Sequence, residues 1–230
     1  MSDALVIFAK APVVGQVKTR LCPPLSLTEA AELAGCFLID TVVQANALSG
    51  VQVYLAFTPP ESEPIFRALL PVAVEYIPQR GDSLGERELN IFTDLFQRKH
   101  SCIVLIGSDI PTLPITYIQE AFTRLENEQC DAVFGPSQDG GYYLVGARAA
   151  HQMLFENITW STSMVLTETI AQAHRHGLNI ALLPSWYDID DKDDLRRLAA
   201  ELDQSHESSS APRTQEFLIR LKLGGENLWR

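Results

Sequence analysis

Short apolar runs rich in β-branched residues recur along the chain, and most are closed by glycine, proline or aspartate. Runs of this length and composition are typical of buried strands. They cover residues 5–9, 51–58, 72–77, 102–106, 131–135, 142–146 and 179–183. Most are separated by longer segments with apolar positions three and four residues apart, as in amphipathic helices. This alternation predicts an α/β fold with a mostly parallel sheet and helices on both faces.

Two capping boxes mark helix starts. Ser26 with Glu29 begins one predicted helix, and Ser83 with Glu86 begins another that runs to about Lys99. Further helices are predicted over 61–70 and about 114–128, before Gly177, and up to about residue 202. The turn at 138–141 joins two adjacent strands and predicts an antiparallel insertion in the sheet.

The domain organisation follows from the composition of the C-terminal part. A length of 230 residues allows one large domain or two small ones, and neither a repeat nor a boundary is visible before residue 203. Beyond it the chain becomes polar and serine-rich, as disordered segments are. We predict one domain over 1–203, a disordered linker over 204–214 and a tail over 215–230 whose residues 215–223 have the spacing of a small helix.

Charge and cysteine usage narrow the class of partner. The formal net charge of −11 argues against nucleic acid, since a polyanion needs a basic surface. No run is long enough to span a membrane, and the first apolar run lacks the basic residues of a signal peptide. The cysteines (Cys22, Cys36, Cys102 and Cys130) form no Cys-x-x-Cys pair or zinc-like spacing. We therefore expect a reduced, cytoplasmic protein, and the net charge does not argue against a small nucleotide as partner.

Charged side chains follow several of the predicted strands. Because loops after parallel strands open at one edge of a sheet, these residues should converge, although they are far apart in sequence. They are Lys18 and Arg20 after the first strand, Asp109 after the strand at 102–106, Asp139 in the turn at 138–141, and Asp188 and Asp190 after the last strand. Cations beside carboxylates suit a substrate with phosphates and a divalent metal, Mg²⁺ or Mn²⁺.

Each of these residues also has a purely structural interpretation. Asp109 would cap a turn or the next helix, and Lys18 and Arg20 would be solvated loop charges. Acids from 188 to 194 would cap a helix, which we prefer for Asp191, Asp193 and Asp194. Asp188 and Asp190 instead flank Ile189 in strand-like alternation, so both can face the same edge.

Six segments together resemble one family in their order along the chain. They are FAKAPVVGQVKTRL, GDSLGER, VLIGSDIPTL, GPSQDGGYYLVG, ITWST and YDIDDKDDL, within residues 4–202. The family is the small bacterial GT-A-type proteins of nucleotide-diphospho-sugar transferase fold, usually labelled glycosyltransferases of arsenosugar biosynthesis. It is similar to the guanylyltransferase that activates phospholactate and, more distantly, to sugar-nucleotide pyrophosphorylases.

The resemblance implies a Rossmann-like GT-A fold and a transferase that uses a nucleotide-diphosphate sugar. The loop with Gly15, Lys18 and Arg20 would wrap the nucleotide phosphates. Asp109 would bind the metal, with Asp188 or Asp190 as a second contact. Gly107-Ser108-Asp109 offers one carboxylate where GT-A enzymes typically have Asp-any-Asp. The first loop also lacks the Gly-Gly-any-Gly motif of pyrophosphorylases, which weakens the nucleotidyltransferase interpretation.

These expectations assign a role to each candidate residue. Lys18 and Arg20 would stabilise the leaving diphosphate, and Asp139 would act as general base if the reaction inverts. The predicted nucleotide or substrate contacts are Lys10, Gly15, Lys18, Arg20, Gly85, Arg87, Ser108, Gly140, Gly141, Trp160, Ser161 and Thr162. For Trp160 we prefer packing in the core over a stacking face for a sugar or base. Two alternatives for the function stay open: a guanylyltransferase-like nucleotidyltransferase acting on an NTP, and a non-catalytic nucleotide-sugar binding protein.

Overall fold

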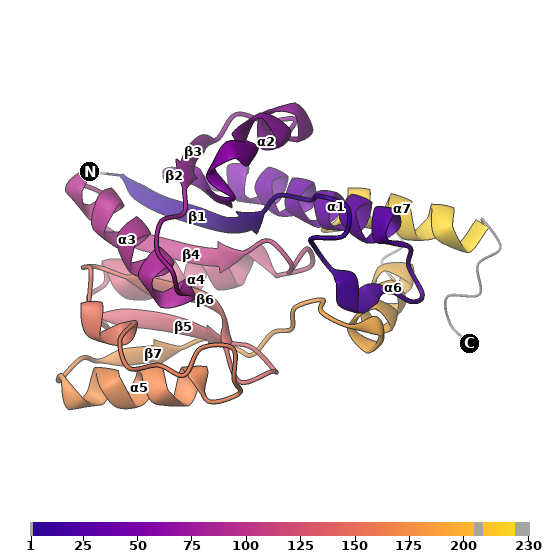
Figure 1. Ribbon diagram of the computed structural model, residues 1–230. Coiled ribbons are helices and arrows are strands. Elements are labelled where there is room, and N and C mark those ends of the chain that lie inside the picture. The colour runs from indigo at the N-terminus through magenta and orange to yellow at the C-terminus, as the bar shows by residue number, and fades with distance from the viewer. Residues whose placement is uncertain (1, 205–208, 224–230) are drawn as a thin grey trace.

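A single seven-stranded sheet forms the centre of the molecule (Figure 1). The computed structural model describes residues 2–204 and 209–223. The strands are β1 (Asp3–Lys10), β2 (Val51–Thr58), β3 (Glu75–Pro78), β4 (Ile103–Gly107), β5 (Ala132–Pro136), β6 (Tyr142–Ala147) and β7 (Ile180–Leu182). Their order across the sheet is β3-β2-β1-β4-β6-β5-β7.

The sheet is parallel except for β6, which pairs antiparallel with both β4 and β5. The α/β class, the mostly parallel sheet and the antiparallel insertion predicted from the sequence are thereby confirmed. Because the other strands run in one direction, β1, β4, β5 and β7 all end at one edge. The loops that follow them meet there and build the candidate site.

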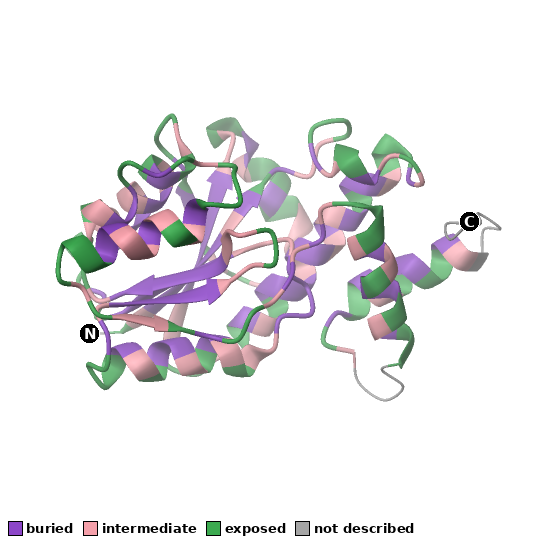
Figure 2. Cartoon of the chain, turned by 90° about the horizontal axis from the view of Figure 1, so that it is seen from below, coloured by how far each residue is buried: buried purple, intermediate pink, exposed green. Residues whose placement is uncertain are grey.

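Helices cover both faces of the sheet. The helices that pack on it are α1 (Leu27–Asn46), α2 (Glu63–Leu69), α3 (Leu84–Gln97), α4 (Ile115–Glu126) and α5 (Val165–Arg175). Two others, α6 (Lys192–Gln204) and α7 (Pro212–Leu223), pack with α1 in a separate cluster away from the strands. One buried cluster joins α1, α2 and α4 to the sheet, and a second joins α3 and α5 to its other face. The central strands are buried on both sides, while the helices turn exposed residues outward (Figure 2). This is why the strands read as continuous apolar runs.

Local signals in the sequence predicted several boundaries well and others less so. The Ser26–Glu29 capping box is present in both directions. At α3, Ser83 accepts from the backbone N–H of Glu86, but the Glu86 carboxylate accepts from the N–H of Asp82, so the predicted second box is wrong in that half. The strand predicted over 72–77 forms a ladder only from Glu75. Among the described residues, no helix combines the length and apolar character needed to cross a membrane.

The C-terminal helix α7 packs against α1, which corrects part of the predicted linker. Residues 212–214, expected to be disordered, form the first turn of α7, while 205–208 lie outside the described residues. The Asp40 carboxylate of α1 accepts hydrogen bonds from the N–H groups of Arg213 (3.0 Å) and Thr214 (2.8 Å). Phe217 and Leu218 are buried in a cluster with α1 and α6. Polar composition suggested disorder because it does not report these long-range contacts.

Candidate functional site

Lys18 is the centre of a polar cluster at the edge where the parallel strands end. It lies in the loop after β1, in a left-handed conformation (φ 49°), directly before a 3-10 helix (Thr19–Leu21). The buried Leu21 anchors this turn in the core. The turn directs the Lys18 side chain inward, where only 6% of it is exposed.

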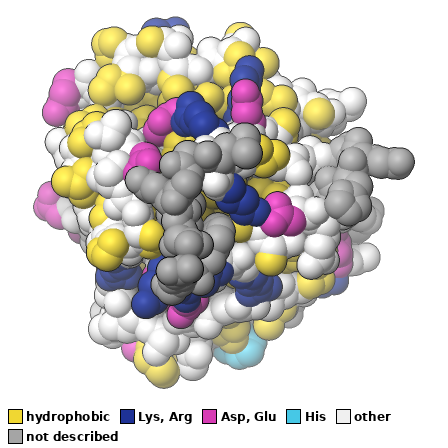
Figure 3. Space-filling view, turned by 90° about the vertical axis from the view of Figure 1, so that its right-hand side faces the viewer, with side chains coloured by type: hydrophobic (Ala, Val, Ile, Leu, Met, Phe, Trp, Pro, Cys, Tyr) yellow, Lys and Arg dark blue, Asp and Glu magenta, His cyan; other side chains and the backbone are white. Residues whose placement is uncertain are grey.

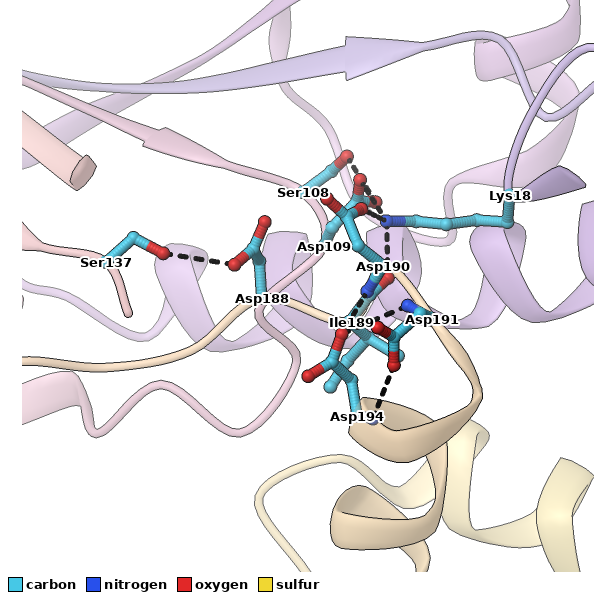
Figure 4. A network of polar contacts seen from close by, with 9 residues as sticks. All are labelled: Lys18, Ser108, Asp109, Ser137, Asp188, Ile189, Asp190, Asp191 and Asp194. Carbon is cyan, nitrogen blue, oxygen red and sulfur yellow. Dashed lines mark hydrogen bonds and ion pairs between the residues drawn. The ribbon is translucent and has the colours of Figure 1, made fainter. Parts of the chain in front are cut away.

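All three protons of the Lys18 ammonium have acceptors in the protein (Figure 4). The Nζ atom lies 2.7 Å from Asp109 Oδ2, 2.9 Å from Asp190 Oδ1 and 2.6 Å from the carbonyl oxygen of Ile189. Burial acts to lower the pKa of Lys18, but the charges of Asp109 and Asp190 outweigh it and raise the pKa. Lys18 is therefore a fixed cation that joins two carboxylates and not a solvated loop charge, while its predicted contact with phosphate stays a prediction.

Asp109 follows β4, and its contacts differ from those of a capping residue. Its backbone carbonyl accepts from the N–H of Ile189 (3.1 Å), which ties the end of β4 to the segment after β7. Its carboxylate pairs with Lys18 and accepts from the Ser108 hydroxyl at 3.3 Å. Within the described ranges this carboxylate accepts no backbone N–H, and the N-cap residue of α4 is Pro114. Asp109 thus faces the cluster and caps neither the turn nor the helix.

Asp188 and Asp190 lie on the same side of the segment after β7. Ile189 between them is 1% exposed, and both acidic side chains line one cavity. The Ser137 hydroxyl donates to Asp188 Oδ1 at 3.0 Å. Burial raises the pKa of Asp188 to about 6, with the negative charges of Asp190 and Asp139 adding to the rise. Burial acts on Asp190 in the same direction, but the charge and hydrogen bond of Lys18 leave the pKa of Asp190 below its ordinary value.

Of the acids that follow, Asp191 and Asp194 have the capping role preferred from the sequence, and Asp193 is an acid of the first turn of α6. Asp191 Oδ1 accepts from the N–H groups of Asp193 (2.7 Å) and Asp194 (3.1 Å), at the start of α6. Asp194 Oδ2 accepts from those of Asp190 and Asp191, both at 3.0 Å. Asp193 pairs with Arg196 at 2.7 Å. These contacts fix the backbone that carries Asp188 and Asp190.

Two cavities adjoin the cluster and share Arg20, Asp109 and Asp190 in their walls. The larger has a volume of about 570 Å³ and extends over Asp188, Trp160 and the 137–141 turn. The smaller, of about 260 Å³, lies against Lys10 and Ser108. Basic and acidic side chains lie beside one another on the face of the molecule shown in Figure 3.

Arg20, predicted as a phosphate ligand, is accessible at the cluster. It is exposed, and within the described part of the chain its guanidinium makes no hydrogen bond or ion pair. Its charge acts on Asp190, where it favours the ionised carboxylate. Since it borders both cavities, it can meet an anionic group that enters either one.

The 138–141 turn and the 160–163 segment form the far wall of the larger cavity. Asp139 is exposed, lines the cavity and accepts from the N–H of Gly141 (2.9 Å). Gly140 packs so closely on the backbone of Ser163 that a Cβ atom would lie 2.2 Å from its carbonyl oxygen. Ser161 and Thr162 line the cavity, Ser161 in a left-handed conformation (φ 63°).

Not all predicted contacts lie on a cavity wall. Gly85 is buried beneath the Trp160 ring, since a Cβ atom there would be 2.4 Å from it. Trp160 packs against the core, as expected, and also lines the larger cavity, while its contact with a ligand stays a prediction. Gly15 (φ 77°) and Arg87, which donates to the Gly81 carbonyl at 2.9 Å, line neither of the two cavities.

Several residues of the larger cavity were not predicted from the sequence, among them Ser137, Glu88 and Tyr142. Glu88 of α3 is 3% exposed, lines the larger cavity and accepts a 2.6 Å hydrogen bond from the Tyr142 hydroxyl of β6. Burial raises the pKa of Glu88 to about 8, despite the opposing effect of this hydrogen bond. The available signal was its position on the apolar side of α3, three and four residues before the buried Ile91 and Phe92.

The acidic residues fit a divalent cation that is held together with substrate phosphates. Among the residues that the structure describes, no group of three or more His, Cys, Asp or Glu side chains could by itself hold a metal ion. Lys18 compensates only part of the negative charge of Asp109, Asp188 and Asp190. Mg²⁺ is commonly bound by one or two carboxylates plus phosphate oxygens. Asp188 and Asp190 could supply the carboxylates of such a site.

The chain is similar to one protein family over about half of its length. A family model described as "Uncharacterized protein conserved in bacteria (DUF2064)" matches residues 41–162. No curated protein matches the chain. A solved structure from Desulfovibrio desulfuricans G20, titled a "putative nucleotide-diphospho-sugar transferase", has 31% sequence identity and a TM-score of 0.88. The match covers 97% of this chain and 96% of that one. The resemblance to a small bacterial family with the nucleotide-diphospho-sugar transferase fold is thereby confirmed.

Two more distant structures share the fold alone. A CMP:2-keto-3-deoxy-manno-octonic acid synthetase in complex with CTP has 12% identity and a TM-score of 0.59, over 89% of this chain and 99% of that one. The manganese complex of Rv0371C from Mycobacterium tuberculosis H37Rv has 15% identity and a TM-score of 0.53, over 86% of this chain and 98% of that one.

Proposed function

The chain belongs to the bacterial DUF2064 family. From this membership and the geometry of the site, we propose that the protein transfers a sugar from a nucleotide-diphosphate donor to a small-molecule acceptor. The observation that carries the proposal is the exposed Arg20 beside Asp109, Asp188 and Asp190 on one cavity. The relative with 31% identity bears the description of a nucleotide-diphospho-sugar transferase, which supports it. A volume of about 570 Å³ suits a small ligand.

Arg20 is the residue that would bind the diphosphate. Its guanidinium can form two parallel hydrogen bonds to phosphate oxygens and stabilise the charge that builds on the leaving group. Lys18 cannot add to this without releasing Asp109, Asp190 or the Ile189 carbonyl. Its part is to hold the two carboxylates in place.

Asp188 and Asp190 would hold the divalent cation. A cation bound there would share the charge of the diphosphate. The Ser137 hydroxyl fixes one oxygen of Asp188, and the Lys18 ammonium fixes one oxygen of Asp190. Because these two contacts orient the carboxylates, the second oxygen of each can face the ligand.

Asp139 is the proposed general base for an inverting transfer. One of its oxygens accepts from the Gly141 N–H, which orients the carboxylate at the cavity wall. The second oxygen can accept the proton of an acceptor hydroxyl. A retaining reaction would not need this base.

The second candidate is a nucleotidyltransferase that joins an NTP to a phosphorylated small molecule and releases pyrophosphate. The observation in its favour is the shared fold with the synthetase whose structure contains CTP. This is an argument from fold alone, since the same fold can carry different reactions. The same Arg20 and carboxylates would then act at the α-phosphate of the NTP.

Incubation of the protein with Mn²⁺ or Mg²⁺ and a panel of sugar nucleotides and NTPs tests the proposal. Release of NDP from a sugar nucleotide, even by slow hydrolysis, supports it, and pyrophosphate release from an NTP supports the nucleotidyltransferase instead. Binding without product for every acceptor supports a non-catalytic protein. Arg20→Gln should lower the rate about 100-fold. Arg67→Gln, a change of the same kind at an exposed arginine of α2, should leave it unchanged.

A further inference from the structure

The carboxyl of Glu88 is buried at the wall of the larger cavity, and in the described residues no basic side chain pairs with it. It comes from α3, and its side chain faces the cavity together with Tyr142 and Trp160. In the described residues the Tyr142 hydroxyl is its one hydrogen-bond partner. Neither Lys18 nor Arg20 pairs with it. Glu88 is therefore separate from the charged cluster, although both border the same cavity.

Burial of this carboxyl works against folding. A carboxyl group removed from water with a single hydrogen bond destabilises the folded chain, and an apolar residue would suit this position of α3, beside Ile91 and Phe92. Polar groups that are buried against stability in a cavity are frequent in ligand-binding sites. The position calls for a ligand that completes the hydrogen bonds of Glu88.

We propose that Glu88 and Tyr142 form a subsite that binds ring hydroxyls of the transferred sugar. This inference rests on the proposed function and names the part of the substrate that lies at α3. Glu88 and Tyr142 offer a carboxyl and a phenol within 2.6 Å of one another. The Trp160 ring lines the same cavity, as do the hydroxyls of Ser161 and Thr162.

The chemistry of these groups favours a neutral ring with hydroxyls. A phosphate would find no cation among Glu88, Tyr142 and Trp160, so the diphosphate belongs at Arg20. Since the pKa of Glu88 is raised to about 8 by burial, its carboxyl is mostly protonated at neutral pH and can both donate and accept. Sugar hydroxyls also donate and accept, and an aromatic ring suits the apolar face of a sugar.

The test compares a sugar nucleotide with its own NDP. Calorimetric titrations of UDP-glucose against UDP and of GDP-mannose against GDP, each with Mn²⁺, are run on the native protein and on Glu88→Leu, Glu88→Gln and Tyr142→Phe. For the sugar nucleotide that the native protein binds, Glu88→Leu should weaken binding about tenfold or more while leaving the NDP affinity within about twofold. Glu88→Gln and Tyr142→Phe should give smaller losses of the same kind. Glu61→Gln, at an exposed residue before α2, should change neither.

Melting temperatures separate binding from a structural role. Glu88→Leu should melt at the same temperature as the native protein or higher. If Glu88→Leu melts at a lower temperature and its affinities for the sugar nucleotide and the NDP keep the native ratio, Glu88 stabilises the fold and the proposed subsite is wrong. Equal losses for the sugar nucleotide and the NDP would place the nucleoside there and also overturn it. If the native protein binds none of these compounds, the proposed function fails and the subsite with it.

Discussion

Replacement of Glu88 by glutamine should remove a pH dependence from the stability of the protein. The pKa of this carboxyl is raised from 4.5 to about 8 in the folded state, because burial disfavours its charged form. Between these two values the folded state binds more protons than the unfolded state. The free energy of unfolding therefore falls as the pH rises from 4.5 to 8. Glutamine cannot ionise, and its amide oxygen can still accept from Tyr142.

The size of the effect follows from the rise in pKa and the burial of the group. The rise from 4.5 to about 8 corresponds to at most about 5 kcal/mol above pH 8, at about 1.36 kcal/mol per pKa unit. Glu88 is 3% exposed, so screening by bulk solvent is small, but the cavity lets some water approach. We expect Glu88→Gln to gain about 2–4 kcal/mol relative to the native protein between pH 5 and pH 9. For a chain of this length that is roughly 5–15 °C in melting temperature.

Urea denaturation at a series of pH values from 5 to 9 measures this difference. Glu61→Gln, which removes an exposed carboxyl, should follow the native curve throughout. The reasoning fails if Glu88→Gln also runs parallel to the native protein. It fails equally if Glu88→Gln is the less stable protein at pH 9, because the charged carboxyl would then be a favourable part of the fold.

Three further changes test the contacts around the site and the C-terminal helix. Lys18→Met leaves Asp109 and Asp190 unpaired; since those side chains are 39% and 49% exposed, we expect a loss of about 1–2 kcal/mol in urea denaturation, partly restored by adding Asp190→Asn. Asp188→Asn removes one of the two proposed metal ligands and should abolish Mn²⁺-dependent nucleotide binding in calorimetry; since asparagine can still accept from the Ser137 hydroxyl, the melting temperature should move by no more than about 2 °C. Asp40→Ala removes the acceptor of two N–H groups of α7 and should lower the free energy of unfolding by about 1–2 kcal/mol, as measured with urea.

The elements of the fold that depend on local sequence were predictable. The run at 51–58 became β2 with the same boundaries, because β-branched residues bounded by Pro59 and Pro60 leave few alternatives. The turn at 138–141 predicted the antiparallel pair. The start of α7 was missed because its first N–H groups are satisfied by Asp40, more than 170 residues away.

In the candidate site too, the sequence predicted which residues lie there better than it predicted their contacts. Parallel topology was enough to bring Asp109, Asp188 and Asp190 to one edge. The sequence could not show that Lys18 would be surrounded by three acceptors, since the Ile189 carbonyl and Asp190 lie 171 and 172 residues from it. These contacts are the reason that we propose Lys18 as a positioning group and the exposed Arg20 as the ligand of the diphosphate. Glu88 looked like an ordinary helix acid, because its burial depends on β6 packing over α3.

Crystals grown with Mn²⁺ and a non-hydrolysable sugar nucleotide offer the most direct test of the central claim. Diffraction at the manganese edge locates the metal, and the electron density locates the diphosphate. The account predicts an anomalous peak between Asp188 and Asp190, with the diphosphate at Arg20 in the larger cavity. Metal and nucleotide bound elsewhere on the protein, or a nucleotide in this cavity with its phosphates away from Arg20, would contradict it.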